Sequence, residues 1–150
     1  MVLDKNFKEF IALLNANEVK YLLIGGYAVA LHGHPRYTQD IDFWIWTNKD
    51  NAIKVLKALH EFGFGTLPID ESDFISPSNV IQLGYPPLRI DLTMSISGVQ
   101  NFEQAFENRL EVNLGDLIIP VIGLDDLKIN KKASGRYKDL ADLESLEEDS

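Results

Sequence analysis

The chain has 150 residues, and its 14 lysines and arginines against 23 aspartates and glutamates give a formal net charge of −9. That charge argues against a passive nucleic-acid binder, whose affinity comes from neutralising phosphates. Cysteine is absent, which excludes disulfides, zinc–thiolate sites and cysteine nucleophiles. No apolar run approaches the roughly 20 residues of a membrane span, and the charged N-terminus does not look like a signal peptide. We therefore expect a single domain over residues 1–150, in the cytoplasm and without a membrane partner.

The first half of the chain predicts helices that alternate with strands. Apolar residues spaced three and four apart favour helices, whereas short apolar runs bounded by glycine favour strands. In chain order we expect a helix carrying Phe7, Phe10, Ile11 and Leu14, a strand over 19–24, a helix over 27–32, a strand over 39–46, and a helix carrying Ile53, Leu56, Leu59 and Phe62.

The second half adds hairpins to this pattern. The segment Gly84-Tyr85-Pro86-Pro87 between two apolar runs favours a hairpin loop, and Gly115-Asp116 does the same further along. Crossovers together with hairpins predict an α+β fold, with a mixed β-sheet flanked by helices. The expected elements are strands over 80–83 and 88–94, a helix over 102–106, strands over 111–113 and 117–122, and a helix from Leu124 that is interrupted near Ser134-Gly135.

Asp40 and Asp42 are the first residues that point to chemistry. Residues i and i+2 of a strand share a face, so both carboxylates project together about 7 Å apart. Ile41, Phe43 and Ile45 then take the opposite face, which suits a core. Because acids are depleted in strands, two of them in one apolar strand indicate either a functional site or a solvent-facing edge strand.

Asp91 lies in the middle of another apolar strand, and two interpretations are open. Arg89 is an obvious candidate partner for an ordinary ion pair. If this strand neighbours the first one, however, three carboxylates converge. Two like charges about 4 Å apart cost on the order of 4 kcal/mol at an effective dielectric near 20. Such a cluster needs protons or a cation, and oxygen-only ligands select magnesium or manganese over zinc.

Two other segments suggest a phosphate site. Gly25-Gly26 follows a strand and precedes a helix, where backbone N–H groups can face an anion, although a plain structural turn is the alternative. Residues 128–138 hold five cations and no acid, and residues 139–149 hold six acids and no base. The cationic block either meets a polyanion or forms one end of a solvated helix.

In combination these pieces resemble the nucleotidyltransferase superfamily of the DNA polymerase β type. The nearest likeness is to minimal nucleotidyltransferases and the AbiEii-like toxin family. Many members have Gly-Ser where this chain has Gly25-Gly26, and that serine helps to hold the triphosphate. The pieces run through nearly the whole chain in the family's order: Gly25-Gly26, Arg36-x-Thr38-x-Asp40-x-Asp42, Asp91, and Lys131-x4-Arg136-x-Lys138-Asp139-x2-Asp142-Leu143.

The resemblance implies a nucleotidyltransferase-like fold and the transfer of a nucleoside monophosphate from a nucleoside triphosphate such as ATP to a protein or RNA hydroxyl. It implies that Asp40, Asp42 and Asp91 are catalytic and hold two Mg²⁺ (or Mn²⁺) ions. It also implies a partner protein of a toxin–antitoxin pair. The nucleotide-binding residues that it implies are Gly25, Gly26, Arg36, Thr38, Lys131 and Arg136.

Several alternatives stay open. The chain is either an active transferase, a non-catalytic member that binds a nucleotide or a partner protein, or a phosphohydrolase that uses the same metals on water. Arg136 either holds phosphate or pairs with Asp139 or Asp142 and fixes the last helix. Trp44 and Trp46, on the same face as the two acids, either stack on a base or pack in the core.

Overall fold

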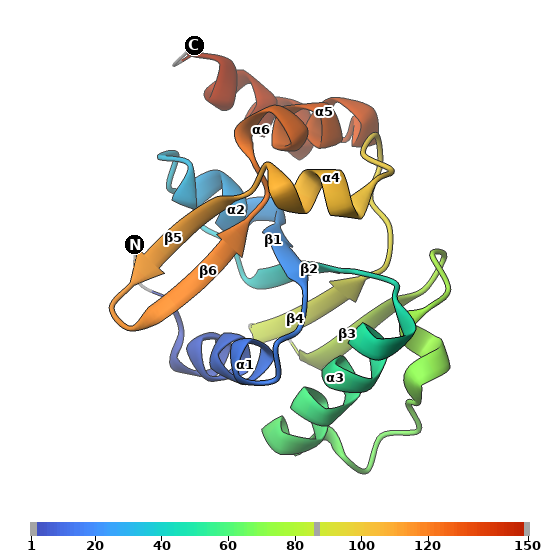
Figure 1. The fold of residues 1–150 in the computed structure, drawn as a ribbon. Coiled ribbons are helices and arrows are strands. Elements are labelled where there is room, and N and C mark those ends of the chain that lie inside the picture. Colours follow the sequence, from blue (N-terminus) through green and yellow to red (C-terminus); the bar gives the residue numbers. More distant parts are fainter. Residues whose placement is uncertain (1–2, 86–87, 149–150) are drawn as a thin grey trace.

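A computed structural model describes residues 3–85 and 88–148, and its centre is a six-stranded sheet. The strands are β1 (Tyr21–Ile24), β2 (Asp40–Ile45), β3 (Val80–Tyr85), β4 (Leu88–Thr93), β5 (Leu110–Leu114) and β6 (Leu117–Val121). Their order across the sheet is β3-β4-β2-β1-β6-β5. The β2–β4 and β1–β6 pairs run parallel and the other neighbours antiparallel, so the mixed sheet predicted from the sequence is confirmed (Figure 1).

Helices cover both faces of this sheet. In Figure 1, α1 and α3 lie in the lower part of the molecule and α4, α5 and α6 in the upper part. On β2, Phe43 packs against Phe10 from below, whereas its neighbour Trp44 packs against Phe102 from above. The helices are α1 (Lys5–Ala16), α2 (Gly25–Leu31), α3 (Lys49–Leu59), α4 (Phe102–Glu107), α5 (Leu124–Ser134) and α6 (Tyr137–Glu148).

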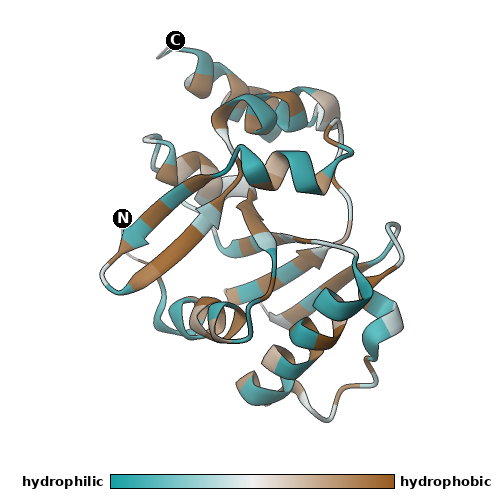
Figure 2. Ribbon diagram, viewed as in Figure 1, coloured by the Kyte–Doolittle hydropathy of each residue, from teal (hydrophilic) through white to brown (hydrophobic). Residues whose placement is uncertain are grey.

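The core forms where the apolar spacing predicts it. Asp4 caps α1 by accepting a hydrogen bond of 2.8 Å from the Asn6 amide. The expected helix stripe is buried at Phe7, Phe10, Ile11 and Leu14. Figure 2 shows hydrophobic residues along the central strands and hydrophilic ones on the outer sides of the helices. Burial of this stripe, together with the apolar faces of the strands and the other helices, stabilises the scaffold of the site.

Local boundaries differ from expectation at a few points. The helix expected over 27–32 begins at Gly25, directly after β1. The expected break near Ser134-Gly135 is confirmed, because Gly135 adopts a left-handed φ of 66° that ends α5 before α6 starts. The structure adds a short helical turn over Glu71–Phe74 that the apolar pattern did not predict, since its start depends on Asp70 and Asp73 acting as a capping box. Pro86-Pro87 of the expected hairpin loop lie outside the described residues.

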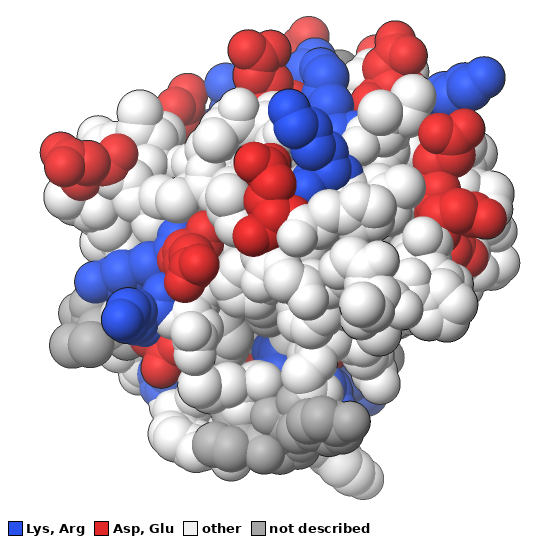
Figure 3. Space-filling model, turned by 90° about the horizontal axis from the view of Figure 1, so that it is seen from below, with Lys and Arg blue, Asp and Glu red and all other residues white. Residues whose placement is uncertain are grey.

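The surface is mixed in charge on the side shown in Figure 3. Acidic and basic side chains are scattered among uncharged ones on this lower face, and they form no continuous basic patch there. Within residues 3–85 and 88–148, no helix is both long and apolar enough to cross a bilayer.

Candidate active site

The two acid-bearing strands are direct neighbours. Strands β2 and β4 pair in parallel with Asp42 opposite Asp91, and with Asp40 opposite Arg89. These four residues therefore share the upper face of the sheet, while Ile41 and its alternating neighbours are buried on the lower face. The structure thus brings Asp40, Asp42 and Asp91 into one row of carboxylates, which we call the acid row, because β2 and β4 are neighbours in this register.

Burial and the pairing of β2 with β4 both raise the pKa of Asp42, because the pairing places this carboxyl group beside Asp91. Burial raises the pKa of Asp42, and the negative charge and side-chain contact of Asp91 and the charge of Asp40 raise it further, to about 6. Lys138 partly offsets these effects. A carboxyl group with such a pKa indicates that the negative charge around it is incompletely compensated. Groups with shifted pKa values are common in functional sites.

Arg89 compensates the other end of the row. Its Nε donates to Asp91 Oδ1 at 2.9 Å, and its Nη2 donates to Asp91 Oδ2 and Asp40 Oδ2, each at 3.0 Å. Both interpretations of Arg89 and Asp91 drawn from the sequence are therefore realised at once. The arginine is the ion-pair partner of Asp91, and it also links two of the three converging carboxylates.

The donor set suits a hard divalent cation on its chemistry. Carboxylate oxygens are the ligands that Mg²⁺ and Mn²⁺ prefer, and the raised pKa of Asp42 beside Asp91 reflects a negative charge that a cation would neutralise. Within the described part of the chain, no group of three acidic or histidine side chains is already arranged around a common metal position. Arg89 explains this, because its guanidinium group lies between Asp40 and Asp91.

The glycine turn lies against the same row. Gly25 has a left-handed φ of 72°, and a Cβ atom on it would collide with the Asp42 carboxylate. A Cβ atom on Gly26 would lie 2.9 Å from both Arg36 Nη2 and Thr38 Oγ1. The turn therefore requires glycine for space as well as for conformation, and it gathers the residues expected to hold the nucleotide.

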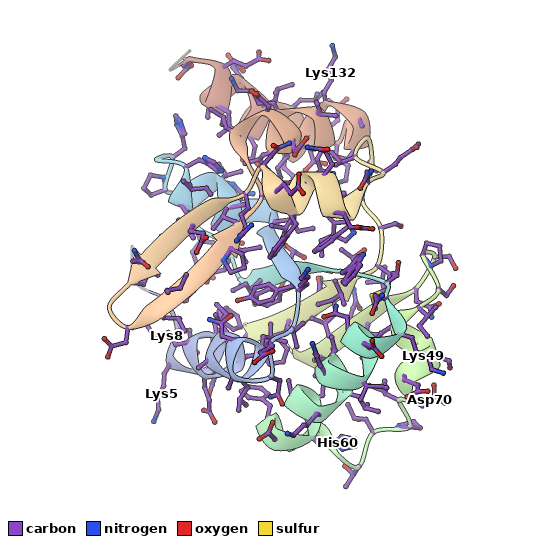
Figure 4. The ribbon with its side chains drawn as sticks, in the orientation of Figure 1. Lys5, Lys8, Lys49, His60, Asp70 and Lys132 are labelled. Atoms are coloured by element: carbon purple, nitrogen blue, oxygen red, sulfur yellow. The ribbon has the colours of Figure 1, made fainter. Side chains whose placement is uncertain are left out.

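The cationic segment 128–138 has some of its side chains in the interior and others on the surface. Lys131 is only 3% exposed, and its Nζ lies 3.2 Å from Asp139 Oδ1 and 2.9 Å from Asp142 Oδ2. Lys132, the next residue, points away from the fold at the top of Figure 4. The α5–α6 pair is thus held by a buried lysine that bridges two carboxylates.

Arg36 and Arg136 complete this network from different directions. Arg36 donates to Asp142 through Nε at 2.7 Å and Nη2 at 2.9 Å, which ties the segment before β2 to α6. Arg136 donates to Asp139 through Nε at 2.7 Å, and two thirds of its side chain remains exposed. Of the two possibilities raised for Arg136, the structure places it in the pairing with Asp139.

The pKa of Asp139 records how strongly the network favours its charged form. Burial alone would raise this pKa, but hydrogen bonds from Arg136 and Ser134 and the charge of Lys131 outweigh burial and lower it to about 2. The pKa of Asp142 is likewise lowered, because Arg36 and Lys131 overcome the effect of burial. Arg36, Lys131 and Arg136 of this network line the same cavity as the three acids, so fixed cations lie near the carboxylates.

The three acids, the glycine turn and the cations of this network line one cavity of about 680 Å³. Every residue predicted as catalytic or nucleotide-binding lines it: Gly25, Gly26, Arg36, Thr38, Asp40, Asp42, Asp91, Lys131 and Arg136. The sequence argument did not assign Arg89, Lys138, Ser134 or Asp139 to the site, although they line the same cavity. Two features of the sequence could have identified some of them. Lys138 and Asp139 belong to the family-like motif that begins at Lys131, and Arg89 shares a strand face with Asp91.

Comparison with known proteins gives the chain a family. A family model described as "Nucleotidyltransferase of unknown function (DUF6036)" matches residues 2–147. The curated protein sequences contain no match. Several solved structures share the fold at low sequence identity.

The lincosamide antibiotic adenylyltransferase LnuA, solved with lincomycin bound, has a TM-score of 0.62 and 19% identity over 97% of both chains. A Thermotoga maritima protein with a nucleotidyltransferase description has a TM-score of 0.59 and 16% identity over 95% of this chain and 88% of its own. An antigenic nucleotidyltransferase-like protein from Paracoccidioides brasiliensis has a TM-score of 0.56 and 15% identity over 93% of this chain and 72% of its own. With these structures confirming the expected nucleotidyltransferase-like fold, and with a family model that spans nearly its whole length, the chain belongs to the DUF6036 family of nucleotidyltransferases.

Proposed function

We propose that this protein transfers a nucleoside monophosphate from a nucleoside triphosphate to a hydroxyl group, with Asp40, Asp42 and Asp91 as the catalytic carboxylates. The observation that carries the proposal is the convergence of these three acids, the glycine turn and the cationic segment on one cavity. Family membership supports the reaction class. Nucleotidyl transfer needs little covalent chemistry from a protein and depends mainly on positioning and charge stabilisation, which such a cavity can supply.

In this proposal the three acids hold divalent metal, as two Mg²⁺ or Mn²⁺ ions. When bound, such ions lower the pKa of the attacking hydroxyl and stabilise the leaving pyrophosphate. The chain's own residues do the rest. Gly25 and Gly26 would let phosphate oxygens approach the backbone. Arg36, Lys131 and Arg136 line the same cavity and would lie beside the triphosphate, and the exposed part of Arg136 can face it while the pairing with Asp139 is kept.

Thr38 offers a replacement for the serine that many members carry after the first glycine of the turn. A side chain at Gly26 would meet the Thr38 hydroxyl at 2.9 Å, so that hydroxyl occupies the space beside the turn. In the structure this hydroxyl donates to the Asp40 carbonyl oxygen at 3.2 Å, and we propose that it donates to the triphosphate instead when the nucleotide binds. Thr38→Val should then raise the nucleotide KM about tenfold while leaving the melting temperature nearly unchanged.

The direct test is incubation of the purified protein with Mg²⁺, cell extract and each nucleoside triphosphate labelled at its α-phosphate. We expect label in an acceptor, with transfer abolished in Asp42→Asn and Asp91→Asn. The exposed Asp116, in the turn between β5 and β6, supplies the control variant Asp116→Asn, which should transfer normally. No labelled product with any of the four nucleotides would contradict the proposal.

A second candidate function is a non-catalytic protein that binds a nucleotide or a partner protein. The ion pairs of Arg89 with Asp40 and Asp91 favour it, because one guanidinium group from within the chain already occupies two of the three carboxylates. Nucleotide binding without transfer would support this candidate, and release of free nucleoside monophosphate would instead support a phosphohydrolase. An AbiEii-like relationship and a toxin–antitoxin partner protein stay predictions, which co-purification with a neighbouring gene's product would test.

A further inference from the structure

A second hollow, of about 590 Å³, adjoins the candidate active site. We call it the aromatic groove. It lies between the end of β2, the segment that follows β4, and the start of α4. Its wall is built by Trp44, which meets Phe102 edge-on at 5.0 Å, and by Trp46, which stacks on Phe102 at 6.4 Å. The volume is in the range of pockets that hold small molecules.

The groove adjoins the cavity that holds the three acids. Ser95 and Ile96 line both the 590 Å³ groove and the 680 Å³ cavity, so these two residues form their common boundary. Trp44 follows Asp42 by two residues on β2 and projects from the same face, about 7 Å further along the strand. Trp44 is only 2% exposed and forms the floor of the groove, so a molecule in the groove above it can place a hydroxyl group beside the carboxylates.

The direction of nucleotidyl transfer assigns this groove to the acceptor. Strand β1 runs antiparallel to β2 with Ile24 opposite Asp42, so the glycine turn that follows lies toward the Asp40 end of β2. Arg36 and Thr38 lie at that same end, beside Gly26. The groups suited to phosphate and the aromatic groove thus lie on opposite sides of the acid row.

In-line displacement requires the attacking oxygen to enter opposite the leaving group. The acceptor oxygen forms a bond to the α-phosphorus, and its proton passes to solvent. The bond from the α-phosphorus to the bridging oxygen breaks, and pyrophosphate leaves with that electron pair. If pyrophosphate leaves toward Gly26 and Arg36, the hydroxyl arrives from the side of Trp44.

The chemistry of the groove selects the kind of acceptor. Its described lining contains no lysine or arginine, and its only charged side chain is Glu103. Lys20 lies over the Trp46 ring at 5.1 Å but outside the lining, so an RNA backbone would find no cation within the groove to replace its counterions. Trp44 and Phe102 are buried, so the apolar surface open to a ligand comes from Trp46, Pro77 and Ile96. The hydroxyl and amide groups of Thr47, Ser95, Gln100 and Asn101 suit a ligand with several polar groups.

Resting on the proposed function, we propose that the aromatic groove binds the acceptor, and that this acceptor is a small hydroxylated molecule with an apolar face and no negative charge. The sequence alone led us to expect a protein or RNA acceptor. The groove's size and its single acidic charge favour the small molecule instead.

The first experiment separates cell extract into small-molecule, RNA and protein fractions and supplies each with enzyme, Mg²⁺ and ATP labelled at the α-phosphate. Label in the small-molecule fraction supports the inference. Label confined to RNA or protein overturns the inference while the proposed function stands. Label in none, with any of the four nucleotides, overturns both.

The second experiment measures ligand binding in the groove and requires no turnover. The chain has 2 tryptophans, and both line the groove, so a ligand in the groove should change tryptophan fluorescence. Phenyl β-glucosaminide, which carries hydroxyls, an aryl face and an amine, should shift the emission with a dissociation constant roughly tenfold lower than that of phenyl β-glucuronide, its anionic counterpart. Equal binding of the two probes, or no response to the glucosaminide, would overturn the inference.

Matched pairs of variants test whether the acceptor and the probe bind in the aromatic groove. Gln100→Phe places a ring inside the groove and should raise the acceptor KM and the probe dissociation constant about tenfold, with the nucleotide KM unchanged. Gln104→Phe adds the same ring on the exposed side of α4, outside the groove lining, and should change neither value. If Gln100→Phe fails to fold, Glu103→Lys with Glu107→Lys as its control serves instead. Only Glu103→Lys should reverse the preference between the two glycosides, and an unchanged preference would count against the proposal.

Discussion

At Asp42 the chain holds a carboxyl group that burial and the neighbouring Asp91 both push toward its protonated form. Its position could be predicted from sequence, because alternation within a strand places Asp40 and Asp42 together. Its pairing with Asp91 could not, because no local pattern says that β4 is the parallel neighbour of β2. The role of Arg89 depended on the same missing information, since an i, i+2 ion pair with Asp91 and a bridge to Asp40 look identical in sequence.

Asp42→Asn should stabilise the metal-free protein at neutral pH. The pKa of Asp42 is raised from 3.8 to about 6, so its folded-state penalty is absent only well below pH 3.8, grows as the pH rises toward 6, and is complete above that value. Removing the charge should raise the free energy of unfolding by up to about 3 kcal/mol at pH 7.5 and by only about 0.5 kcal/mol at pH 4. Urea unfolding in EDTA at both pH values measures this. The same gain in Asp116→Asn would show that the effect is not local to the site.

Arg89→Gln should make the protein more responsive to metal. The guanidinium group of Arg89 compensates Asp40 and Asp91, so its loss leaves their charges to repel Asp42 and to attract a divalent cation. We expect a lower melting temperature in EDTA and a Mg²⁺-induced rise roughly twice that of the unaltered protein. Thermal unfolding across a Mg²⁺ titration provides the measurement, and an unchanged response would mean that Arg89 does not compete with metal.

Among the elements, α5 and α6 show how one motif can contain two different roles. Lys131 and Arg136 appeared in the sequence as equivalent cations for phosphate, yet Lys131 is buried between two carboxylates while Arg136 is mostly exposed. Helical spacing predicts which residues share a face, but not that Arg36, 106 residues from Asp142 in sequence, completes the cluster. The fold of these helices was predictable, and their attachment to the site was not.

Lys131→Ala should therefore cost stability as well as any activity. It would leave Asp139 and Asp142 buried without their lysine, and breaking such a pair typically costs about 3–5 kcal/mol. Lys132→Ala, the adjacent exposed lysine, should change the unfolding free energy by no more than about 0.5 kcal/mol. Denaturant unfolding of both variants checks this, and similar values for the two would contradict the buried network as the structure has it.

Viewed as a whole molecule, the cavity is walled by segments from both ends of the chain, from the glycine turn after β1 to the first turn of α6. The α+β class and the order of the elements followed from apolar periodicity. The order of the strands across the sheet did not follow from periodicity. Strand β2 lies between β1 and β4, and because the β2–β4 pair is parallel, no hairpin sequence between the two strands predicts that they are neighbours. The family resemblance supplied what periodicity could not.

Mg²⁺ and ATP together should protect these separate segments from hydrogen exchange at the same time. A ligand in the cavity would contact the turn after β1, the acid row and the α5–α6 pair, so it stabilises every opening that separates them. We expect slower exchange in residues 33–42, β4 and α6, and no such effect from inorganic phosphate at the same concentration. Protection confined to the glycine turn would show that the ligand does not span the cavity.

The bridge from Arg89 to Asp40 also bears on how the protein is made. The two residues are 49 positions apart, and their strands pair in parallel through a long crossover. Such non-local pairing is slow, because the entropy of closing the loop is lost before any contact is gained. On the ribosome, Asp40 and Asp42 emerge well before Arg89 and Asp91, and all four emerge before the α5–α6 pair. A nascent chain therefore cannot gather the carboxylates before β4 has emerged, and it cannot complete the cavity before α5 and α6 have followed.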